Sequence, residues 1–248
     1  MSKKILLFDL ETSPNLGYVW GKWEQNVLSY TKEWELLSVA YKWLDEKEVH
    51  CLKRPDFKDK TDKALTKELK KLLDQAEIVI AHNGDEFDIK KSNAKFIQHG
   101  LGPTSAYQKI DTKKVAKKYF KFNSNSLDDL GQLLGVGRKE KTGGFDLWLD
   151  CMAGKKEAWK RMVQYNKQDV LLLERVYLKL RPWMEQHPNV SFLQDDLPNG
   201  CPKCGEKKLY PKGFKYNKTG KVRQYVCTNC GGYCLSRISV KHAKPEYK

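Results

Sequence analysis

The chain has 248 residues, enough for one enzyme-sized domain and a small appendage, and its 46 Lys and Arg against 31 Asp and Glu give a formal charge of +15. A chain this basic is expected to meet a polyanion, usually nucleic acid and less often an anionic membrane. No segment approaches the ~20 apolar residues of a membrane span, and no basic start leads into a long apolar run, so the sequence predicts a cytoplasmic protein with no membrane partner.

The predicted elements begin as strands and continue as strands and helices, which indicates an α/β domain with a helical C-terminal half. Strands are expected at residues 4–11, 36–43, 48–52 and 77–81, and helices at residues 65–73, 90–99, 126–134 and 155–185. Leucines at helical spacing support the first of these helices, and Ser126 is a candidate N-cap for the third. We find no internal repeat.

The stretch ILLFDLETSP, residues 5–14, sets two carboxylates into an apolar strand. Successive side chains of a strand point to opposite faces, so Asp9 and Glu11 share one face. Neighbouring like charges raise each other's pKa, and a buried carboxylate is costly unless it is paired or bound to a metal ion. The sequence therefore predicts a cation beside these two residues.

Two further acids stand at positions typical of functional sites. Asp88, in AHNGDEFDIK, follows shortly after the strand predicted at residues 77–81, and sites commonly form at strand ends in open α/β sheets. In YNKQDV, Tyr165 and Asp169 are four residues apart and therefore lie on one helical face. Asp169 borders an apolar stripe, which is an unusual place for a solvated charge.

In this order, the motifs resemble those of the DEDD exonuclease superfamily. The matching residues are Asp9 and Glu11 for the first motif, Asn83, Phe87 and Asp88 for the second, and Tyr165 and Asp169 for the third. Gln164 stands where the histidine subgroup needs His, so the chain resembles the tyrosine subgroup, which includes the proofreading domains of family B DNA polymerases. The resemblance covers residues 3–185 and implies a ribonuclease H-like fold, a mixed sheet flanked by helices.

The resemblance also implies a reaction, the removal of nucleotides from a 3′ end with two Mg²⁺ or Mn²⁺ ions. In the arrangement typical of the family, Asp9 bridges both ions, while Glu11, Asp88 and Asp169 complete the coordination and Tyr165 orients the attacking water. Tyrosine, with a pKa near 10, is a poor base at neutral pH, so we expect it to act through a hydrogen bond. Without cations, four such acids repel one another by about 4 kcal/mol per pair at 4 Å, which favours partial protonation.

Three residues are candidates for substrate contact: Asn83 in the second motif, Lys141 in the loop GRKEKTGGF, and Arg223 in the basic C-terminal part. A lysine in a Gly-rich loop is more often simply solvated. We expect His82 to be a core histidine with satisfied hydrogen bonds, and Asp111 to cap the helix that follows it.

The C-terminal part of the chain holds five of the seven cysteines. CPKCG and CTNCG repeat the Cys-x2-Cys spacing of structural zinc sites and resemble a zinc ribbon. The expected ligands of one structural Zn²⁺ are Cys201, Cys204, Cys227 and Cys230. We expect Cys234 to be a small packed side chain, although a ligand swap stays open. So short a segment needs the metal because it cannot bury enough core alone.

These signals predict an exonuclease domain at residues 1–187, a linker at residues 188–199, and a zinc ribbon with a basic tail at residues 200–248. Between the cysteine pairs, basic residues alternate with aromatic ones, which suits phosphate contact and base stacking. Zinc ribbons also bind proteins, so a protein partner is an alternative for this part of the chain.

Three functions stay open from the sequence. The first is a 3′–5′ exonuclease, with single-stranded DNA as the preferred substrate and RNA as a possibility. The second is an RNA-trimming or structure-specific nuclease that uses the same site. The third, of another class, is a non-catalytic nucleic-acid-binding or adaptor protein, and the intact acids at every motif position argue against it.

Overall fold

The computed structural model describes residues 4–23, 26–54, 61–193, 200–217 and 220–240. The chain divides into two compact units, one of Lys4–Val176 and one that contains the described residues from Tyr177 onward. Residues 194–199 of the predicted linker and residues 241–248 of the predicted basic tail lie outside the described residues. The domain boundaries expected from the sequence stay a prediction.

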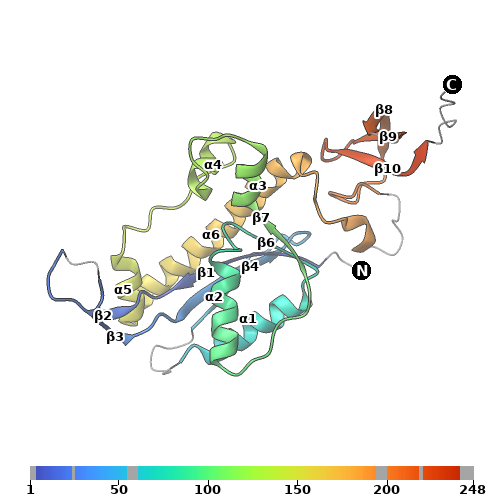
Figure 1. Ribbon diagram of the computed structural model, residues 1–248. Coiled ribbons are helices and arrows are strands. Elements are labelled where there is room, and N and C mark those ends of the chain that lie inside the picture. Colours follow the sequence, from blue (N-terminus) through green and yellow to red (C-terminus); the bar gives the residue numbers. More distant parts are fainter. Residues whose placement is uncertain (1–3, 24–25, 55–60, 194–199, 218–219, 241–248) are drawn as a thin grey trace. The chain divides into compact units, whose positions relative to one another are not determined.

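A five-stranded mixed sheet forms the centre of the first unit, in the order β5-β4-β1-β6-β7 (Figure 1). Its strands are β1 (Ile5–Thr12), β4 (Leu36–Trp43), β5 (His50–Lys53), β6 (Ile78–Ala81) and β7 (Gln108–Asp111). β1 pairs antiparallel with β4 and parallel with β6, and β6 pairs parallel with β7. β6 is buried along its whole length, which explains its uninterrupted apolar sequence.

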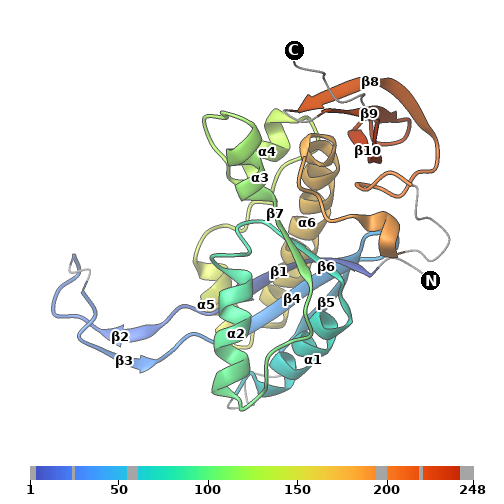
Figure 2. The ribbon, with the colours of Figure 1, turned by 45° about the vertical axis from the view of Figure 1, so that its right-hand side comes forward.

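Helices cover both faces of this sheet (Figures 1 and 2). The helices are α1 (Lys63–Gln75), α2 (Asp88–Gln98), α3 (Thr112–Tyr119), α4 (Leu127–Leu133), α5 (Asp146–Met152) and α6 (Lys156–Leu180). α1 and α2 pack on one face with Leu6, Phe8 and Leu10 of β1, whereas α5 and α6 pack on the other with Leu37 of β4. The predicted fold class, a mixed sheet flanked by helices, is confirmed.

The helix predicted at residues 155–185 is wrong at its end. α6 stops at Leu180, and a 3₁₀ turn follows at Arg181–Trp183. Pro182 lies in this turn and has no N–H to continue the α-helical hydrogen bonds. Within the described residues, no helix has both the length and the apolar character needed to cross a bilayer.

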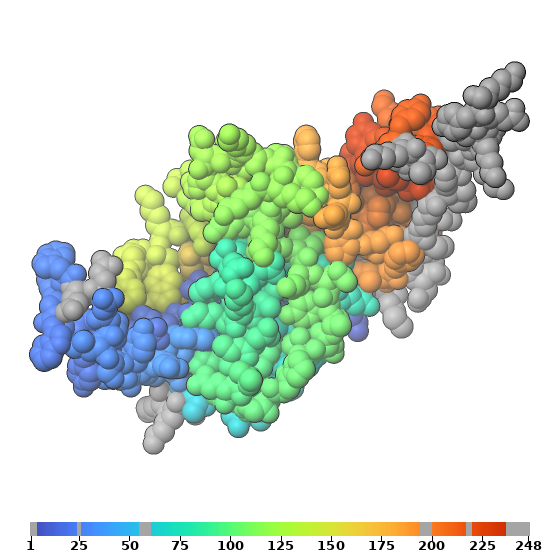
Figure 3. All heavy atoms as spheres, viewed as in Figure 1, coloured from blue at the N-terminus to red at the C-terminus, as the bar shows by residue number. Residues whose placement is uncertain are grey.

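The structure has two short strands that the sequence did not predict, β2 (Leu16–Tyr18) and β3 (Ser29–Lys32). They pair antiparallel and lie between β1 and β4 in the chain. We call residues 16–23 and 26–32 the hairpin arm. Figures 1 and 2 show it extending away from the sheet, and in Figure 3 it forms a projection of the first unit.

The second unit contains a three-stranded antiparallel sheet in the order β10-β9-β8. Its strands are β8 (Leu209–Asn217), β9 (Gly220–Cys227) and β10 (Tyr233–Val240), and the turn Val190–Leu193 precedes them. One cysteine pair precedes β8, and the other lies at the turn between β9 and β10. So small a sheet buries little core, so a bound metal adds to the stability of such a unit where its ligands are present.

Candidate functional site

The alternation of β1 separates its core residues from its acids. Leu6, Phe8 and Leu10 pack toward α1 and α2, so Asp9 and Glu11 point to the opposite face, which α6 covers. Asp169 lies on α6. Oxygen atoms of Asp9, Glu11 and Asp169 all lie within 4.8 Å of one another. We call these three residues the acid cluster.

Asp88 is the first residue of α2 and lies against the backbone of β1. Its Oδ1 accepts a hydrogen bond of 3.0 Å from the backbone N–H of Leu10, and the residue is only 2% exposed. The charge of Asp88 helps to raise the pKa of Asp9, so the two carboxylates interact. The structure therefore brings the fourth acid next to the acid cluster, although its oxygens are not among the three that converge within 4.8 Å.

A buried asparagine holds Asp9 in place. Nδ2 of Asn166 donates to Oδ2 of Asp9 at 2.7 Å, and Oγ of Ser38 donates to Oδ1 of Asn166 at 2.9 Å. Asn166 is fully buried on α6. Sequence reasoning missed it, but its position three residues before Asp169 places both on neighbouring parts of one helical face, a signal that was present in YNKQDV.

Lys139 places an ammonium group among these carboxylates. Its Nζ donates to Oδ2 of Asp169 at 2.6 Å and to the hydroxyl of Tyr165 at 3.0 Å. Burial alone would lower the pKa of Lys139, but the charge of Asp169 and the bond to Tyr165 raise it above its ordinary value. The sequence named Lys141 of the same loop instead, because nothing in the loop's composition distinguishes the two lysines.

The acids are strongly perturbed. Burial, followed by the charges of Asp88, Glu11 and Asp169, raises the pKa of Asp9 well above its ordinary value. Burial, followed by the charge of Asp169, raises the pKa of Glu11 to about 8. Burial also raises the pKa of Asp88 to about 7, even though its hydrogen bond from Leu10 favours the charged form. Repulsion among buried carboxylates is what a bound cation relieves.

One unsatisfied atom supports a metal ion here. Oδ1 of Asp169 is buried and has no hydrogen-bond partner among the described residues. A buried carboxylate oxygen without a donor is costly unless a cation completes its surroundings. The oxygen-only donor set of the acid cluster suits a hard divalent ion, so these residues fit a metal site.

The remaining motif residues have identifiable partners. The ring of Tyr165 meets that of Trp148 edge-on, with centroids 6.1 Å apart, and burial raises the pKa of the Tyr165 hydroxyl. Asn83 adopts a left-handed backbone with φ +65°, and its N–H donates to Oδ1 of Asp111 at 3.0 Å. Lys141 is exposed, and its carbonyl oxygen accepts from Arg161 at 3.3 Å.

Two residues expected to be structural are satisfied as predicted. The ring nitrogens of His82 lie 2.9 Å from Oγ1 of Thr112 and 3.0 Å from the carbonyl of Asn125, and burial lowers its pKa to about 4. Asp111 caps α3 by accepting from the backbone N–H groups of the first turn. Both side chains therefore have the hydrogen-bond partners that a structural role requires.

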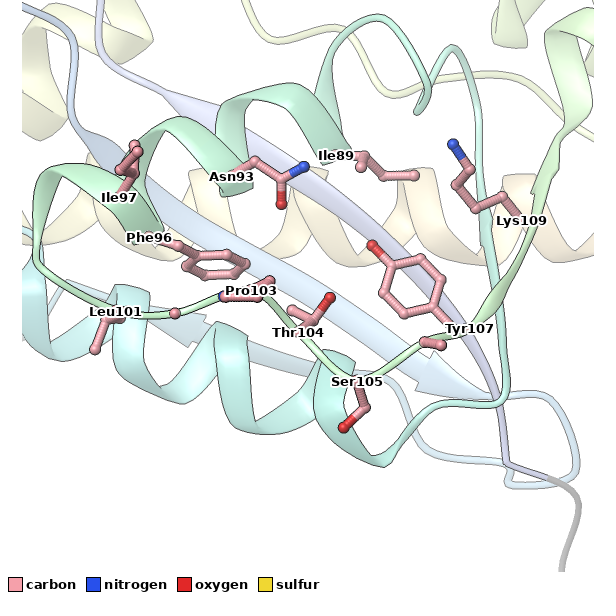
Figure 4. A pocket seen from close by; sticks show the side chains of 12 residues that line it. Ile89, Asn93, Phe96, Ile97, Leu101, Pro103, Thr104, Ser105, Tyr107 and Lys109 are labelled. Atoms are coloured by element: carbon pink, nitrogen blue, oxygen red, sulfur yellow. The ribbon is translucent and has the colours of Figure 1, made fainter.

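A pocket of about 510 Å³ lies elsewhere in the first unit (Figure 4). Side chains of α2, such as Phe96 and Asn93, form one wall, and residues 101–107 form the other. None of the acids described above lines it. The candidate site is therefore defined by its chemistry and not by this hollow.

A second group of metal-binding side chains lies in the second unit. The sulfurs of Cys201, Cys204, Cys227 and Cys230 lie within 4.8 Å of one another. Asn229 and the N–H of Gly232 donate to two of these sulfurs, at 3.8 and 3.4 Å. Cys234 is buried but does not belong to the group. The four-cysteine group fits a zinc ribbon.

The local backbone explains the Cys-x2-Cys-Gly sequence of each pair. Gly205 and Gly231 follow the second cysteine of their pairs and have φ of +82° and +71°. Glycine adopts this left-handed conformation without strain, so the chain can turn and aim both thiols at one point. Farther along, Arg223 is exposed on β9, and its guanidinium lies 4.7 Å from the ring centroid of Phe214.

Comparison with known proteins identifies the family. The profile of the family RNase_H_2, described as RNase_H superfamily, matches residues 24–181, and the chain belongs to this superfamily. The match begins after β1, so it does not include Asp9 and Glu11. Nucleases of this superfamily use divalent metal ions, which agrees with the acid cluster. The family match confirms the ribonuclease H-like resemblance. The four-cysteine group, which lies outside the match, fits the zinc-ribbon resemblance.

Among solved structures, a family B DNA polymerase from the hyperthermophilic archaeon Pyrobaculum calidifontis is similar to this chain. The TM-score is 0.48 at 14% sequence identity, and the alignment covers 72% of this chain. It covers 25% of the polymerase, so the chain spans about a quarter of that protein's length. None of the curated proteins matches the sequence.

Proposed function

We propose that the chain is a metal-dependent 3′–5′ exonuclease that hydrolyses the phosphodiester bonds of single-stranded DNA. The observation that carries this proposal is the convergence of Asp9, Glu11 and Asp169 within 4.8 Å on a ribonuclease H-like sheet. Asp88, held against β1, is the fourth acid of the set. The basic charge of the chain, +15, suits a polyanionic substrate.

The ions proposed for the acid cluster are two Mg²⁺ or Mn²⁺, held by Asp9, Glu11, Asp88 and Asp169. When bound, such ions lower the pKa of an attacking water and stabilise the leaving 3′ oxygen. The chain's own residues organise the cluster: Asn166 fixes the carboxylate of Asp9 through a bond of 2.7 Å.

Tyr165 and Lys139 act beside the acids. The raised pKa of Tyr165 keeps its hydroxyl protonated at neutral pH, so it does not serve as the base and instead positions the attacking water through a hydrogen bond. Lys139 holds that hydroxyl and balances part of the negative charge of Asp169. Its ammonium is also a donor suited to a non-bridging phosphate oxygen.

The second unit is proposed to hold one structural Zn²⁺ and to contact the nucleic acid. Arg223 and Lys221 flank the ring of Phe214, which places cations beside a stacking surface. Asn83 and Lys141 stay predicted substrate contacts in the first unit. A cytoplasmic location also stays a prediction, and a protein partner is the alternative role of the ribbon.

The test is digestion of matched single-stranded DNA and RNA, each labelled at the 5′ end in one reaction and at the 3′ end in another. Mg²⁺, Mn²⁺ and excess chelator are compared. We expect a metal-dependent ladder from the 5′-labelled DNA and immediate release of single nucleotides from the 3′ label. Faster shortening of the RNA would replace DNA by RNA as the substrate. Internal cuts, or no cleavage of either strand, would contradict an exonuclease.

A further inference from the structure

The hairpin arm exposes an unusual number of large apolar side chains. They are Leu16, Tyr18, Val19, Trp20, Trp23, Val27, Leu28 and Tyr30. Trp20 and Trp23 are 84% and 86% exposed. So many exposed apolar side chains in one short segment are typical of an interaction site, because leaving them in water is unfavourable.

The arm is fixed at its base. The N–H of Ser13 donates to the carbonyl of Glu35 at 2.8 Å, and the N–H of Trp34 donates to Oδ1 of Asn15 at 2.8 Å. Nζ of Lys91, on α2, lies 3.6 Å from the ring centroid of Trp34. A lone two-stranded hairpin is marginally stable, and these contacts at its base join it to the sheet and to α2.

The two strands of the arm also approach each other too closely for a side chain at Gly17. A Cβ there would lie 2.4 Å from Cγ1 of Val27 and 2.8 Å from the carbonyl oxygen of Ser29. The glycine therefore permits the pairing of β2 with β3. The residues of the arm and of its base therefore define its conformation.

The arm starts beside the acid cluster. Glu11 pairs with Ser38 in the β1–β4 ladder, and Leu16 begins the arm five residues farther along the chain. Five extended residues span at most roughly 17 Å. The base of the arm therefore lies within roughly 17 Å of Glu11, a distance that a few nucleotides of a strand can bridge.

The chemistry of the arm suits a nucleic-acid strand. Indole and phenol rings stack on bases of any sequence, because every base has a π face. Nζ of Lys22 lies 5.3 Å from the ring centroid of Trp23, so a cation accompanies one of the exposed rings. Residues 16–32 contain two lysines and one glutamate, and the whole chain carries a charge of +15. Continuity with the acid cluster and this charge favour a polyanion over an apolar protein partner.

We propose that the hairpin arm binds the single-stranded nucleic acid whose end occupies the acid cluster, by stacking bases on Trp20 and Trp23. This inference rests on the proposed nuclease function, since it assigns the arm to the substrate of that site. In this role, the arm holds the nucleic-acid strand on the 5′ side of the nucleotide that is removed.

The test measures binding without cleavage. Anisotropy of a fluorescent oligothymidylate is titrated with the full chain in the absence of Mg²⁺ and Mn²⁺. The pair Trp20→Ala and Trp23→Ala is compared with Trp20→Phe and Trp23→Phe, which keeps two stacking rings. Ile97→Ala, on α2, is the control for an exposed apolar side chain, since Ile97 is 80% exposed.

We expect the alanine pair to raise the Kd at least about tenfold, while the phenylalanine pair and Ile97→Ala stay near the wild type. Tryptophan fluorescence of the wild type should fall on binding, and the phenylalanine pair should lose most of this quenching. Unchanged circular dichroism will show that the variants are folded.

Wild-type affinity in the folded alanine pair would overturn the proposal. If sedimentation then showed a wild-type dimer that the alanine pair converts to a monomer, the arm would join two copies of the chain instead. Failure of the proposed nuclease function gives a different result, since the wild type would bind the oligonucleotide but cut no strand in the presence of Mg²⁺ or Mn²⁺.

Discussion

At the scale of single residues, Lys139 connects the acid cluster to Tyr165. Its Nζ donates hydrogen bonds both to Asp169 and to the tyrosine hydroxyl. Loss of Lys139 therefore leaves the hydroxyl of Tyr165 without this donor and the charge of Asp169 without this cation. We predict that Lys139→Met lowers kcat by about 10- to 100-fold, because small misplacements of reacting groups cost rates of this order. The measurement is single-turnover cleavage at saturating Mn²⁺.

Lys141→Met is the matched comparison, because Lys141 belongs to the same loop but its side chain is exposed. If Lys141 contacts the substrate, Lys141→Met should raise KM with little effect on kcat. Equal losses of kcat in both variants would show that the structure does not distinguish the two lysines functionally.

Glu11 gives a prediction on the pH dependence of stability. Its pKa is raised from 4.5 to about 8, so between these values the folded chain binds this proton more tightly than the unfolded chain. Without Mg²⁺ or Mn²⁺, the free energy of unfolding should therefore fall as pH rises toward about 8. Glu11→Gln should reduce this fall, which thermal unfolding across that pH range will measure.

Added Mn²⁺ should also flatten the pH dependence of the wild type, because the metal binds the deprotonated carboxylates. Glu157→Gln, an exposed substitution on α6, is the control and should leave the slope unchanged. A slope that is identical in the wild type and Glu11→Gln, with and without Mn²⁺, would mean that Glu11 titrates normally.

The residues of the motifs are accessible to sequence reasoning because each motif lies within one element or at its end. Strand alternation puts Asp9 and Glu11 on one face, and helical spacing puts Tyr165 near Asp169. Lys139 is different, since it reaches Asp169 across 30 residues of chain from an irregular loop. No local pattern encodes such a contact.

At the scale of elements, α6 supplies three neighbouring residues of the candidate site: Tyr165, Asn166 and Asp169. We predict that Asn166→Ala destabilises the chain by about 1–3 kcal/mol, because it leaves Asp9 and Ser38 without a buried hydrogen-bond partner. Urea unfolding measures this loss, and kcat should fall with it because Asp9 is no longer oriented.

Asn166→Asp provides the matched variant, since it keeps the size of the side chain but adds a carboxylate against Asp9. Repulsion should make it at least as destabilising as alanine in the absence of added metal ions. A neutral effect of both substitutions would show that Asn166 does not hold Asp9.

The longer elements were predictable, whereas several short ones were not. β1, β4 and β6 carry strong apolar patterns, and their positions agree with the sequence expectations. α6 begins within one residue of its expected start and ends earlier than expected, at Leu180. β2 has only three residues, all exposed, so burial leaves no pattern in its sequence. α5 has seven residues, two of them buried, and depends on packing against the sheet. These elements form because tertiary contacts stabilise them.

At the scale of the whole molecule, two groups of side chains fit metal sites, one of oxygen donors and one of sulfur donors. The cysteine spacing was sufficient to group Cys201, Cys204, Cys227 and Cys230, because ligand spacing in zinc ribbons is a local property. The convergence of Asp9 and Glu11 with Asp169 could not be read from spacing, because these acids lie on distant elements that only the fold brings together.

The two sites should respond differently to metal removal. We predict about one Zn²⁺ per chain in the dialysed protein, retained when Mg²⁺ and Mn²⁺ are washed away, because thiolate sites hold zinc tightly. Cys204→Ser should lower the zinc content and the order of the second unit, which atomic absorption and circular dichroism will measure. Cys234→Ser, outside the group of four sulfurs, is the control. Zinc loss from Cys234→Ser alone would reassign the ligands.

The central claim is that the acid cluster cleaves nucleic acid. Its most direct test is the cleavage of 5′-labelled single-stranded DNA at saturating Mn²⁺ by the wild type, Asp169→Asn and Glu157→Gln, the last an exposed control on the same helix. We predict that Asp169→Asn slows cleavage at least about 100-fold while the control shortens the strand like the wild type. Wild-type cleavage by a folded Asp169→Asn chain would contradict the account.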